Sequence, residues 1–439
     1  MLDLLFLMSF FSFPLVVFCL LKLLKLSFFK IELPSMVILF MFVFSYIGIL
    51  PLYFGWVRTS GTLEEKQLQV LVFLCSSWSI LALLLGFCFS KLVMGLHPQS
   101  VPLSVFPMRK GDIAGLLLLL GLSICILYFY LAKVERVALF VALQDGIKEA
   151  KIARSAMTNA FQGRYHWYNL FFEEMLSFIL FAFWSNWLIT KRKVSFCFFS
   201  IAFAVSSFSA IMTTQKGPFI FLLIGLFIVF FLTRRKGYVS KKGIGMVLVS
   251  IIIMLPLMYI LFMGSGNWIK GVLNAFNRAF TGQIAPASFY LELFPDQKDF
   301  LLGQTFPNPG GIFPFVPYRY TIELMNILFP HYREMGIVGS MPTAFWGEAY
   351  INFGWLGVFF VPILMGVWLW ILAYVLNKVR RTPVTIAGIA WLILHFKDLS
   401  MTGFSKFFFD ITLISIFFIV FFVLTTTRLL SKICHFRGS

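Results

Sequence analysis

Apolar runs long enough to cross a lipid bilayer recur along most of this chain. A membrane span needs about 20 mostly apolar residues, because every backbone polar group must be satisfied within the helix itself. The candidate spans are 4–21, 34–56, 69–91, 113–132, 168–190, 194–212, 218–233, 243–263, 345–376, 384–401 and 407–427. These eleven runs predict an all-α polytopic membrane protein, with residues 1–439 forming a single integral membrane domain.

The composition agrees with this class and excludes others. Of the 439 residues, 60% are hydrophobic and only 12% are charged, whereas soluble proteins average about 25% charged residues. A soluble enzyme, a disordered chain and a nucleic-acid-binding module are therefore excluded. The first run has no basic residue before it and no small-residue cleavage site after it, so we expect a retained helix and not a signal peptide.

Clusters of Lys and Arg beside the short loops indicate the orientation. They are Lys22/Lys25/Lys30, Arg109/Lys110, Lys191/Arg192/Lys193, Arg234/Arg235/Lys236/Lys241/Lys242, Lys378/Arg380/Arg381 and Arg428/Lys432/Arg437. With eleven spans, all of them fall on one side together with the C-terminus. We therefore expect the N-terminus outside and the C-terminus in the cytoplasm. The net charge of +18 then lies on the cytoplasmic side, facing anionic lipid and not nucleic acid.

Two long segments between predicted spans face outward, residues 133–167 and 264–344. Long loops of this kind are usually functional, so the outer face is where function is expected. In the first loop, apolar residues from Val137 to Ala160 recur at helical spacing and predict an amphipathic helix. The second loop is rich in Pro, Gly and aromatic residues, which suit a groove that stacks on sugars. A surface-lying helix and an interfacial aromatic belt remain the simpler alternatives.

Nothing in the sequence indicates a metal or a redox centre. Of the six cysteines, five fall in predicted spans and one in the inner tail, with no CxxC pair and no His/Cys cluster at zinc spacing. Asp296 and Asp299 lie in a polar turn without the pattern of a metal site. We therefore predict no cofactor and no metal.

Charged residues at membrane depth are functional candidates, because burying them is costly. Lys216 lies between two apolar segments, just before Pro218. A cation beside the exposed N–H groups of a new helix would bind an anion; the alternative is a solvated lysine in a tight turn. Glu348 lies at the outer start of a long span, where it could act as a general base or form a structural ion pair.

Other charges near the outer ends of spans are given structural roles. Lys397, Asp398 and Lys406 are expected to form an ion pair. Glu173 and Glu174 are expected to complement the dipole at the start of the fifth span, with no catalytic role.

A set of outer cations accompanies the aromatic residues. Its members are Arg136, Arg154, Arg164, Lys216, Arg278, Arg319 and Arg333. Arginine binds phosphate oxygens bidentately, so a lipid diphosphate at the headgroup level with a glycan above it would suit the set. His331 and Tyr350 are further candidate substrate contacts, although a lone loop histidine equally suits a polar surface.

The order of these features resembles the O-antigen polymerases, the Wzy-like oligosaccharide repeat-unit polymerases. Three stretches carry the resemblance: an arginine-to-glycine outer segment, 154–163; a Lys-Gly-Pro helix start, 215–218; and the Gly- and aromatic-rich stretch 339–357. Some members of the family carry an Arg-x10-Gly pattern in each large outer loop. Here Arg154 and Gly163 are separated by eight residues.

The resemblance implies a bacterial inner-membrane glycosyltransferase of GT-C-like architecture. Such an enzyme polymerises undecaprenyl-diphosphate-linked oligosaccharide repeat units into O-antigen or a related surface polysaccharide on the periplasmic face. Its partners would be the lipid-linked donor and acceptor, membrane lipid and a polysaccharide chain-length regulator. Arg154, Lys216 and Arg278 would bind the diphosphate, assisted by Arg319 or Arg333, and Glu348 would be the base. An O-antigen ligase-type transferase and a lipid-linked glycan flippase or transporter remain alternatives.

Overall fold

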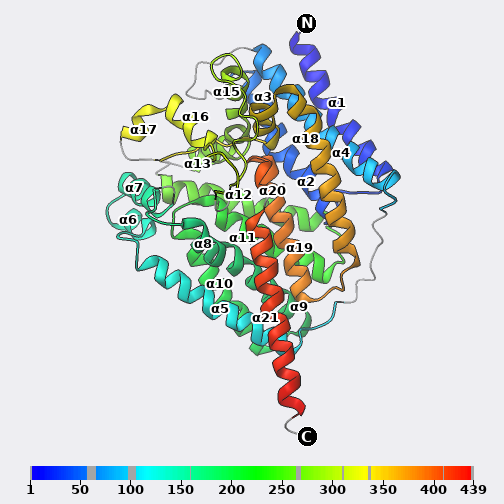
Figure 1. The fold of residues 1–439 in the computed structure, drawn as a ribbon, viewed down its shortest axis with the longest axis vertical. Coiled ribbons are helices and arrows are strands. Elements are labelled where there is room, and N and C mark those ends of the chain that lie inside the picture. The colour runs from blue at the N-terminus through cyan, green and yellow to red at the C-terminus, as the bar shows by residue number, and fades with distance from the viewer. Residues whose placement is uncertain are drawn as a thin grey trace.

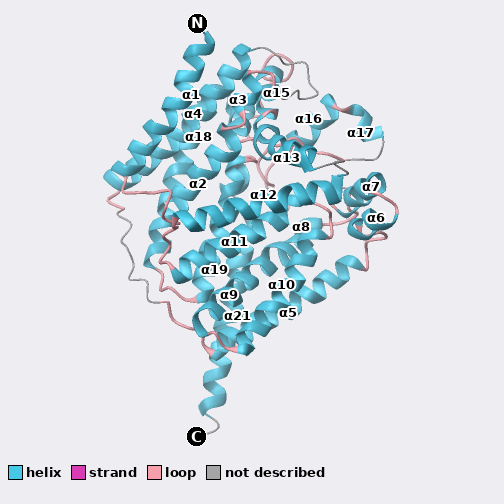
Figure 2. Cartoon of the chain, turned by 180° about the vertical axis from the view of Figure 1, so that it is seen from behind, coloured by secondary structure: helices cyan, strands magenta, loops and turns pink. Residues whose placement is uncertain are grey.

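The computed structural model describes residues 2–56, 66–96, 105–158, 160–263, 268–308, 311–334, 338–408 and 410–436. Over these residues the chain is helical, and its β-structure is a single isolated antiparallel bridge between Lys30 and Tyr238 (Figures 1 and 2). The prediction of an all-α fold is confirmed. The two ends of the chain lie at opposite ends of the long axis of the molecule (Figure 1).

Within the described ranges, 8 helical segments are long and apolar enough to cross a membrane. They are α1 (Leu2–Leu23), α2 with its continuation through η1 and α3 (Leu33–Tyr53), α4 (Lys66–Leu92), α5 (Lys110–Leu131), α10 (Lys193–Ile211), α11 (Lys216–Arg234), α18 (Phe345–Lys378), and α20 with most of α21 (Ser405–Leu430). Apolar side chains such as Phe11 and Phe421 are exposed on the outer faces of α1 and α21. The chain is a multi-pass membrane protein.

The three other runs predicted from sequence coincide with helices that are not among these eight segments. Run 168–190 is η2 (Leu170–Met175), a π-helical turn, followed by α9 (Leu176–Thr190). Run 243–263 is α12 (Lys241–Met263). Run 384–401 is α19 (Pro383–Phe396), followed by the short 3₁₀ helix η5 (Lys397–Ser400).

The two long loops that are predicted to face outward, called the outer loops below, fold as short helices. The first contains α6 (Ala138–Gln144), α7 (Ile147–Met157) and α8 (Tyr165–Asn169). The second contains α13 (Trp268–Phe276), η3 (Asn277–Thr281), α14 (Gly282–Ile284), α15 (Pro286–Leu293), α16 (Tyr320–Leu328) and α17 (Pro330–Glu334). Figures 1 and 2 show α16 and α17 next to α6 and α7 on one flank of the molecule.

The sequence predicts one amphipathic helix in the first loop, whereas the structure has two, α6 and α7. Gly146 separates α6 from α7 with φ at 92°, a left-handed conformation that favours glycine. The backbone N–H groups of Asp145 and Gly146 both donate to the carbonyl of Val141, which ends α6. The apolar spacing was read correctly, since Ala150, Ala153 and Met157 of α7 are buried.

α4 and α18 pack against each other (Figure 1). Their backbones come into contact at two glycines, Gly86 and Gly366. A Cβ on Gly86 would lie 2.3 Å from the carbonyl O of Ile363, and one on Gly366 would lie 2.3 Å from that of Leu83. Only residues without a side chain allow backbones to approach so closely, as is common between membrane helices.

α18 is kinked at Gly354, where φ is 59° and ψ is −145°. The kink removes helical donors from the carbonyls of Ile351 and Asn352. Those carbonyls accept instead from the N–H groups of Leu301 and Leu302, at 2.9 and 3.1 Å. The second outer loop is thereby joined to the membrane helix. A buried carbonyl left without a donor would be costly.

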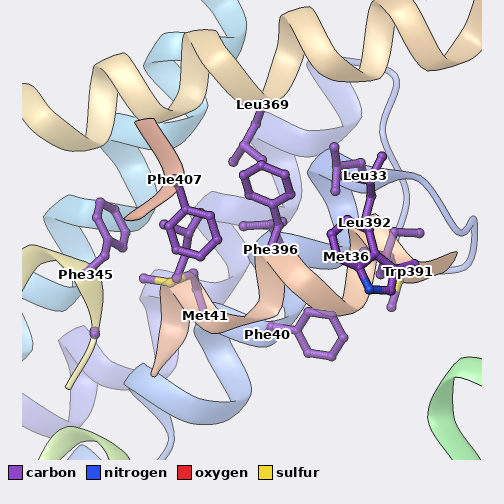
Figure 3. Packing of buried hydrophobic residues seen from close by; sticks show 14 of the residues in the cluster. Leu33, Met36, Phe40, Met41, Phe345, Leu369, Trp391, Leu392, Phe396 and Phe407 are labelled. Carbon is purple, nitrogen blue, oxygen red and sulfur yellow. The ribbon is translucent and has the colours of Figure 1, made fainter. Parts of the chain in front are cut away.

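α19 forms the centre of the bundle and packs against α2, α9 and α11. Its side chains are nearly all buried, which suits an element enclosed by other helices and not by lipid. Figure 3 shows how α2, α18, α19 and α20 (Ser405–Phe408) meet through Leu33, Met36, Phe40, Met41, Phe345, Leu369, Trp391, Leu392, Phe396 and Phe407. The C-terminal end of α19 carries His395 and is followed by Lys397 and Asp398.

Candidate functional site

Three of the cations predicted to bind a diphosphate come together in the fold. Arg154 lies on α7, Lys216 is the first residue of α11, and Arg278 lies on the π-helical turn η3. The charge of Arg278 acts on Arg154, and the charges of Arg154 and Arg278 act on Lys216. We call these three residues the cation cluster.

The electrostatics of the cation cluster favour an anionic ligand. Burial, followed by the positive charge of Arg278, lowers the pKa of the Arg154 guanidinium. Arginine nevertheless stays protonated in proteins. Lys151, one turn before Arg154 on α7, adds a further positive charge near Lys216. Like charges held together away from bulk water repel one another, so an anion that joins them gains their combined attraction.

α7 is held in place by the second outer loop and by the membrane helix α5, which carries Tyr130. The hydroxyl of Ser155 accepts from the backbone N–H of Val338 at 3.2 Å, and the carbonyl of Met157 accepts from the Tyr130 hydroxyl at 2.6 Å. Arg154 directly precedes the first of these two anchor points. The resemblance drew attention to residues 154–163, and the structure shows that their beginning joins the two outer loops.

η3 is positioned by a backbone contact with the end of the second span. A Cβ on Gly48 would lie 2.3 Å from the carbonyl O of Phe280 and 2.8 Å from the N of Thr281. The turn that carries Arg278 therefore rests directly on the backbone at Gly48. π-Helical turns often occur at functional sites, because they project side chains that a regular helix would not.

α11 begins at Lys216, two residues earlier than the sequence indicated, and Pro218 lies within its first turn. Proline fits there because the first N–H groups of a helix have no partner within it. Thr214, two residues before Lys216, has φ at 55°, which turns the chain sharply between α10 and α11. The carbonyl of Met212 in this turn accepts from Leu139 at the start of α6, which joins the turn to the first outer loop.

A pocket of about 270 Å³ lies beside the cation cluster, and Gly217 and Pro218 form part of its wall. Its other lining residues are Phe172, Glu173, Glu174, Ser177, Phe181, Ser206, Ala210, Phe221, Leu222, Trp391, Leu394, His395, Lys397, Asp398 and Met401. It is thus built from η2, α9, α10, α11, α19 and η5. We call it the polar pocket, because five of its residues are titratable.

Most charges of the polar pocket are paired. The Trp391 indole N–H donates to Oε2 of Glu174 at 2.8 Å. The expected ion pair is present: Asp398 accepts from Lys397 at 2.5 Å and from Lys406 at 3.2 Å. The ammonium group of Lys397 also lies 4.0 Å from the ring centre of Phe221 on α11. This pairing ties η5 to α11 and α20.

The imidazole of His395 makes one hydrogen bond and one stacking contact. Its Nε2 bonds to the carboxylate of Asp410, and its ring stacks on Trp391 with the centroids 4.8 Å apart. Both His395 and Asp410 are buried. Sequence reasoning gave neither residue a role.

Glu173 and Glu174 lie at a different place in their helix from the one that the sequence indicated. They were expected in the first turn of a helix, but α8, η2 and α9 follow one another without interruption, so the helix starts at Tyr165. The two carboxylates therefore lie more than two turns inside it and point into the polar pocket. The signal was available in the sequence, since adjacent acids within an apolar run are rarely accidental.

Glu348, the predicted base, is buried with 2% of its surface exposed. Its carboxylate accepts from the backbone N–H and from the hydroxyl of Ser405, at 2.9 and 2.7 Å. A Cβ on Gly403 would lie 2.1 Å from Oε2. Burial, followed by the negative charge of Glu348, raises the pKa of Tyr320 well above its ordinary value. The contacts assign Glu348 to holding residues 403–405 against the start of α18.

The remaining candidates are not among the charges that act most strongly on Lys216. Arg136 pairs with Asp145 at the surface. Tyr350 is buried and donates to the carbonyl of Phe294 at 2.8 Å. The other four candidates are exposed, namely Arg164 at the start of α8, Arg319 at the start of α16, and His331 and Arg333 on α17.

Over the described part of the chain, no group of three or more His, Cys, Asp or Glu side chains is arranged to hold a metal ion. Comparisons of the sequence with protein-family models and with curated proteins, and of the fold with solved structures, give no match. The fold and the site define a multi-pass membrane protein with a cation cluster beside a polar pocket.

Proposed function

We propose that the chain is a glycosyltransferase of the bacterial inner membrane that polymerises undecaprenyl-diphosphate-linked oligosaccharide repeat units into O-antigen or a related surface polysaccharide. The observation that carries this proposal is the cation cluster of Arg154, Lys216 and Arg278. Its members come from two outer loops and a helix start, and an anion with several oxygens is the ligand that such a cluster favours.

The chemistry of the reaction needs what this site offers. The growing glycan on its lipid diphosphate is the donor, and a hydroxyl of a new lipid-linked unit is the acceptor. The lipid diphosphate leaves as a stable anion, so no acid is needed to protonate it. Cations that hold the diphosphate, together with one base for the acceptor hydroxyl, are sufficient.

The proposed topology has eleven crossings, with the N-terminus periplasmic and the C-terminus cytoplasmic. Its support is that residues given an outer position by this topology, among them Glu173, Gly217 and Asp398, line one pocket. The opposite positions of the two chain ends in Figure 1 agree with an odd number of crossings. The GT-C-like architecture is proposed on the resemblance alone.

Deletion of the gene followed by sizing of the surface glycan tests this function. A polymerase gives a ladder that collapses to single repeats on the lipid core. Complementation with Arg154→Ala or Lys216→Ala should leave single repeats, whereas Lys148→Ala, an exposed cation on the same helix α7, should restore the ladder. Normal chain lengths with both cluster variants would contradict the site assignment. Polymer accumulating on the carrier lipid would indicate a ligase instead.

One observation favours a transporter of lipid-linked glycan as the second candidate. Proton-coupled transporters use ionisable groups inside the membrane, and Glu173, His395, Asp398 and Asp410 are enclosed by the helices here. The same deletion separates the two functions. Loss of a transporter leaves no repeat units at the outer face, so even single repeats on the core would disappear.

A further inference from the structure

The polar pocket adjoins the cation cluster at the first turn of α11. Gly217 and Pro218 line the pocket, and the residue immediately before them is Lys216 of the cluster. A ligand whose diphosphate is held by the cluster would therefore bring its attached sugar to the mouth of the pocket. This adjacency joins two features that the sequence had placed in separate segments.

We propose that the polar pocket holds the acceptor sugar and that Glu173 is the catalytic base that takes the proton from its attacking hydroxyl. The inference rests on the proposed function and assigns the step for which Glu348 was the candidate from sequence.

The pairing of the other carboxylates singles out Glu173. Within the pocket, Glu174 accepts from Trp391, and Asp398 is bonded by Lys397 and Lys406. The side chain of Asn169, one turn earlier on the same helix, faces the Glu173 carboxylate. Over the described residues, Glu173 makes no ion pair, so a lone pair remains available to an incoming hydroxyl.

The carboxylates outside the pocket are engaged more fully. Asp410 bonds to His395, and both oxygens of Glu348 accept from Ser405. A base must reach the proton that it abstracts within hydrogen-bond distance. Glu348 lies under Gly403 and cannot receive a sugar without displacing the segment that it holds.

The size and lining of the pocket suit one sugar residue. Its volume of about 270 Å³ lies just below the range of pockets for drug-sized ligands, roughly 300–1,000 Å³. Trp391 and Phe221 contribute aromatic rings to the lining. The hydroxyls of Ser177 and Ser206 each donate to a backbone carbonyl, so their oxygens can still accept from a sugar hydroxyl. Lys397 and Asp398 supply a donor and acceptors at the outer end.

The step balances with these groups alone. The acceptor hydroxyl oxygen forms a bond to the anomeric carbon of the donor glycan, and its proton passes to the Glu173 carboxylate. The bond between that carbon and the diphosphate oxygen breaks, and its electron pair leaves with the lipid diphosphate, whose charge Arg154, Lys216 and Arg278 compensate. Glu173 then releases the proton to the outer aqueous phase, and no oxidant or reductant takes part.

The test uses the full-length protein in proteoliposomes, with undecaprenyl-diphosphate-linked single repeats extracted from the deletion strain as the probe. Glu173→Gln should lower kcat at least about 100-fold, the contribution expected of a general base, while KM changes less than threefold. Its binding of undecaprenyl diphosphate should match that of the wild type. Glu292→Gln, an exposed acid on α15, is the matched control and should keep full activity.

Glu173→Asp is the second variant, because it keeps the charge and preserves folding if the glutamine does not. Its shorter side chain withdraws the base by about one bond, so kcat should fall at least about tenfold. Wild-type kcat in either variant would overturn the assignment, as would an equal loss of undecaprenyl diphosphate binding and of kcat. Failure of the wild-type protein to polymerise would contradict the proposed function itself, which distinguishes the two failures.

Discussion

Ser405 donates twice to the carboxylate of Glu348, through its backbone N–H at 2.9 Å and through its hydroxyl at 2.7 Å. Glu348→Ala would leave the backbone N–H of Ser405 buried without this acceptor, at a cost of about 1–3 kcal/mol. The hydroxyl would keep only the carbonyl of Thr305, at 3.4 Å. We expect a clear drop in the thermal unfolding midpoint of the detergent-solubilised protein. Glu292→Ala on the exposed side of α15 should leave the midpoint within about 1 °C of the wild type. Lost polymerisation with an unchanged midpoint would instead return the base role to Glu348.

The position of Arg278 depends on Gly48, and this dependence can be tested without altering a charge. Gly48→Val would place a side chain where the carbonyl O of Phe280 lies only 2.3 Å from a Cβ, so η3 must move. We expect weaker binding of undecaprenyl diphosphate, by about tenfold or more, because a displaced cation loses its hydrogen bonds to the ligand.

Gly121→Ala on α5 is the matched control for that displacement. Gly121 lies inside a helix with open space around its Cβ position, and alanine there favours the helix by about 0.5–1 kcal/mol. Its binding of undecaprenyl diphosphate should equal that of the wild type. If Gly48→Val also binds normally, Arg278 does not contact the diphosphate.

Sequence reasoning reached the fold class and the membership of the cation cluster for physical reasons. Span length follows from bilayer thickness, and the sidedness of Lys and Arg restricts which loops can meet. Arg154, Lys216 and Arg278 were placed on one side by that logic alone, and the structure shows that their charges interact. Arg319 and Arg333 met the same criteria, yet they lie exposed on the outer loop. The side of the membrane predicted for a residue does not determine which residues on that side lie close together in the fold.

The roles of the carboxylates could not be inferred in the same way. Whether a carboxylate can accept a proton from a substrate or only stabilises the fold depends on its hydrogen-bond partners. The partner of Glu348 is Ser405, 57 positions away, and the partner of Glu174 is Trp391, 217 positions away. No local pattern encodes such pairings. The start of the helix that carries Glu173 was likewise misplaced, because the π-helical turn η2 continues a helix begun before the apolar run.

The stability of the protein should be especially sensitive to a larger side chain at the contact between α4 and α18. Gly366→Leu would force the backbones apart, since even a Cβ would lie 2.3 Å from the carbonyl O of Leu83. Overpacking of this kind typically costs about 1–3 kcal/mol and can be larger. We expect reduced yield of monodisperse protein and an unfolding midpoint several degrees lower. Gly245→Ala on α12, with open space around its Cβ position, should be neutral in the same assay.

The kink of α18 gives the last prediction. Gly354 combines φ of 59° with ψ of −145°, a region of backbone conformation that is essentially restricted to glycine. Its Cβ would also lie 3.0 Å from Cζ of Phe300. Gly354→Ala should therefore destabilise the protein by about 1–3 kcal/mol, measured by thermal unfolding in detergent.

Loss of the kink would also have a consequence that instability alone does not have. The carbonyls of Ile351 and Asn352 would regain helical donors, and Leu301 and Leu302 would lose their acceptors. Residues 301–305 should then detach from α18, which limited proteolysis and amide exchange of this segment would detect. A variant such as Gly366→Leu should lower the unfolding midpoint without increasing amide exchange selectively at residues 301–305. Equal protection of that segment in Gly354→Ala and the wild type would show that the kink does not depend on glycine.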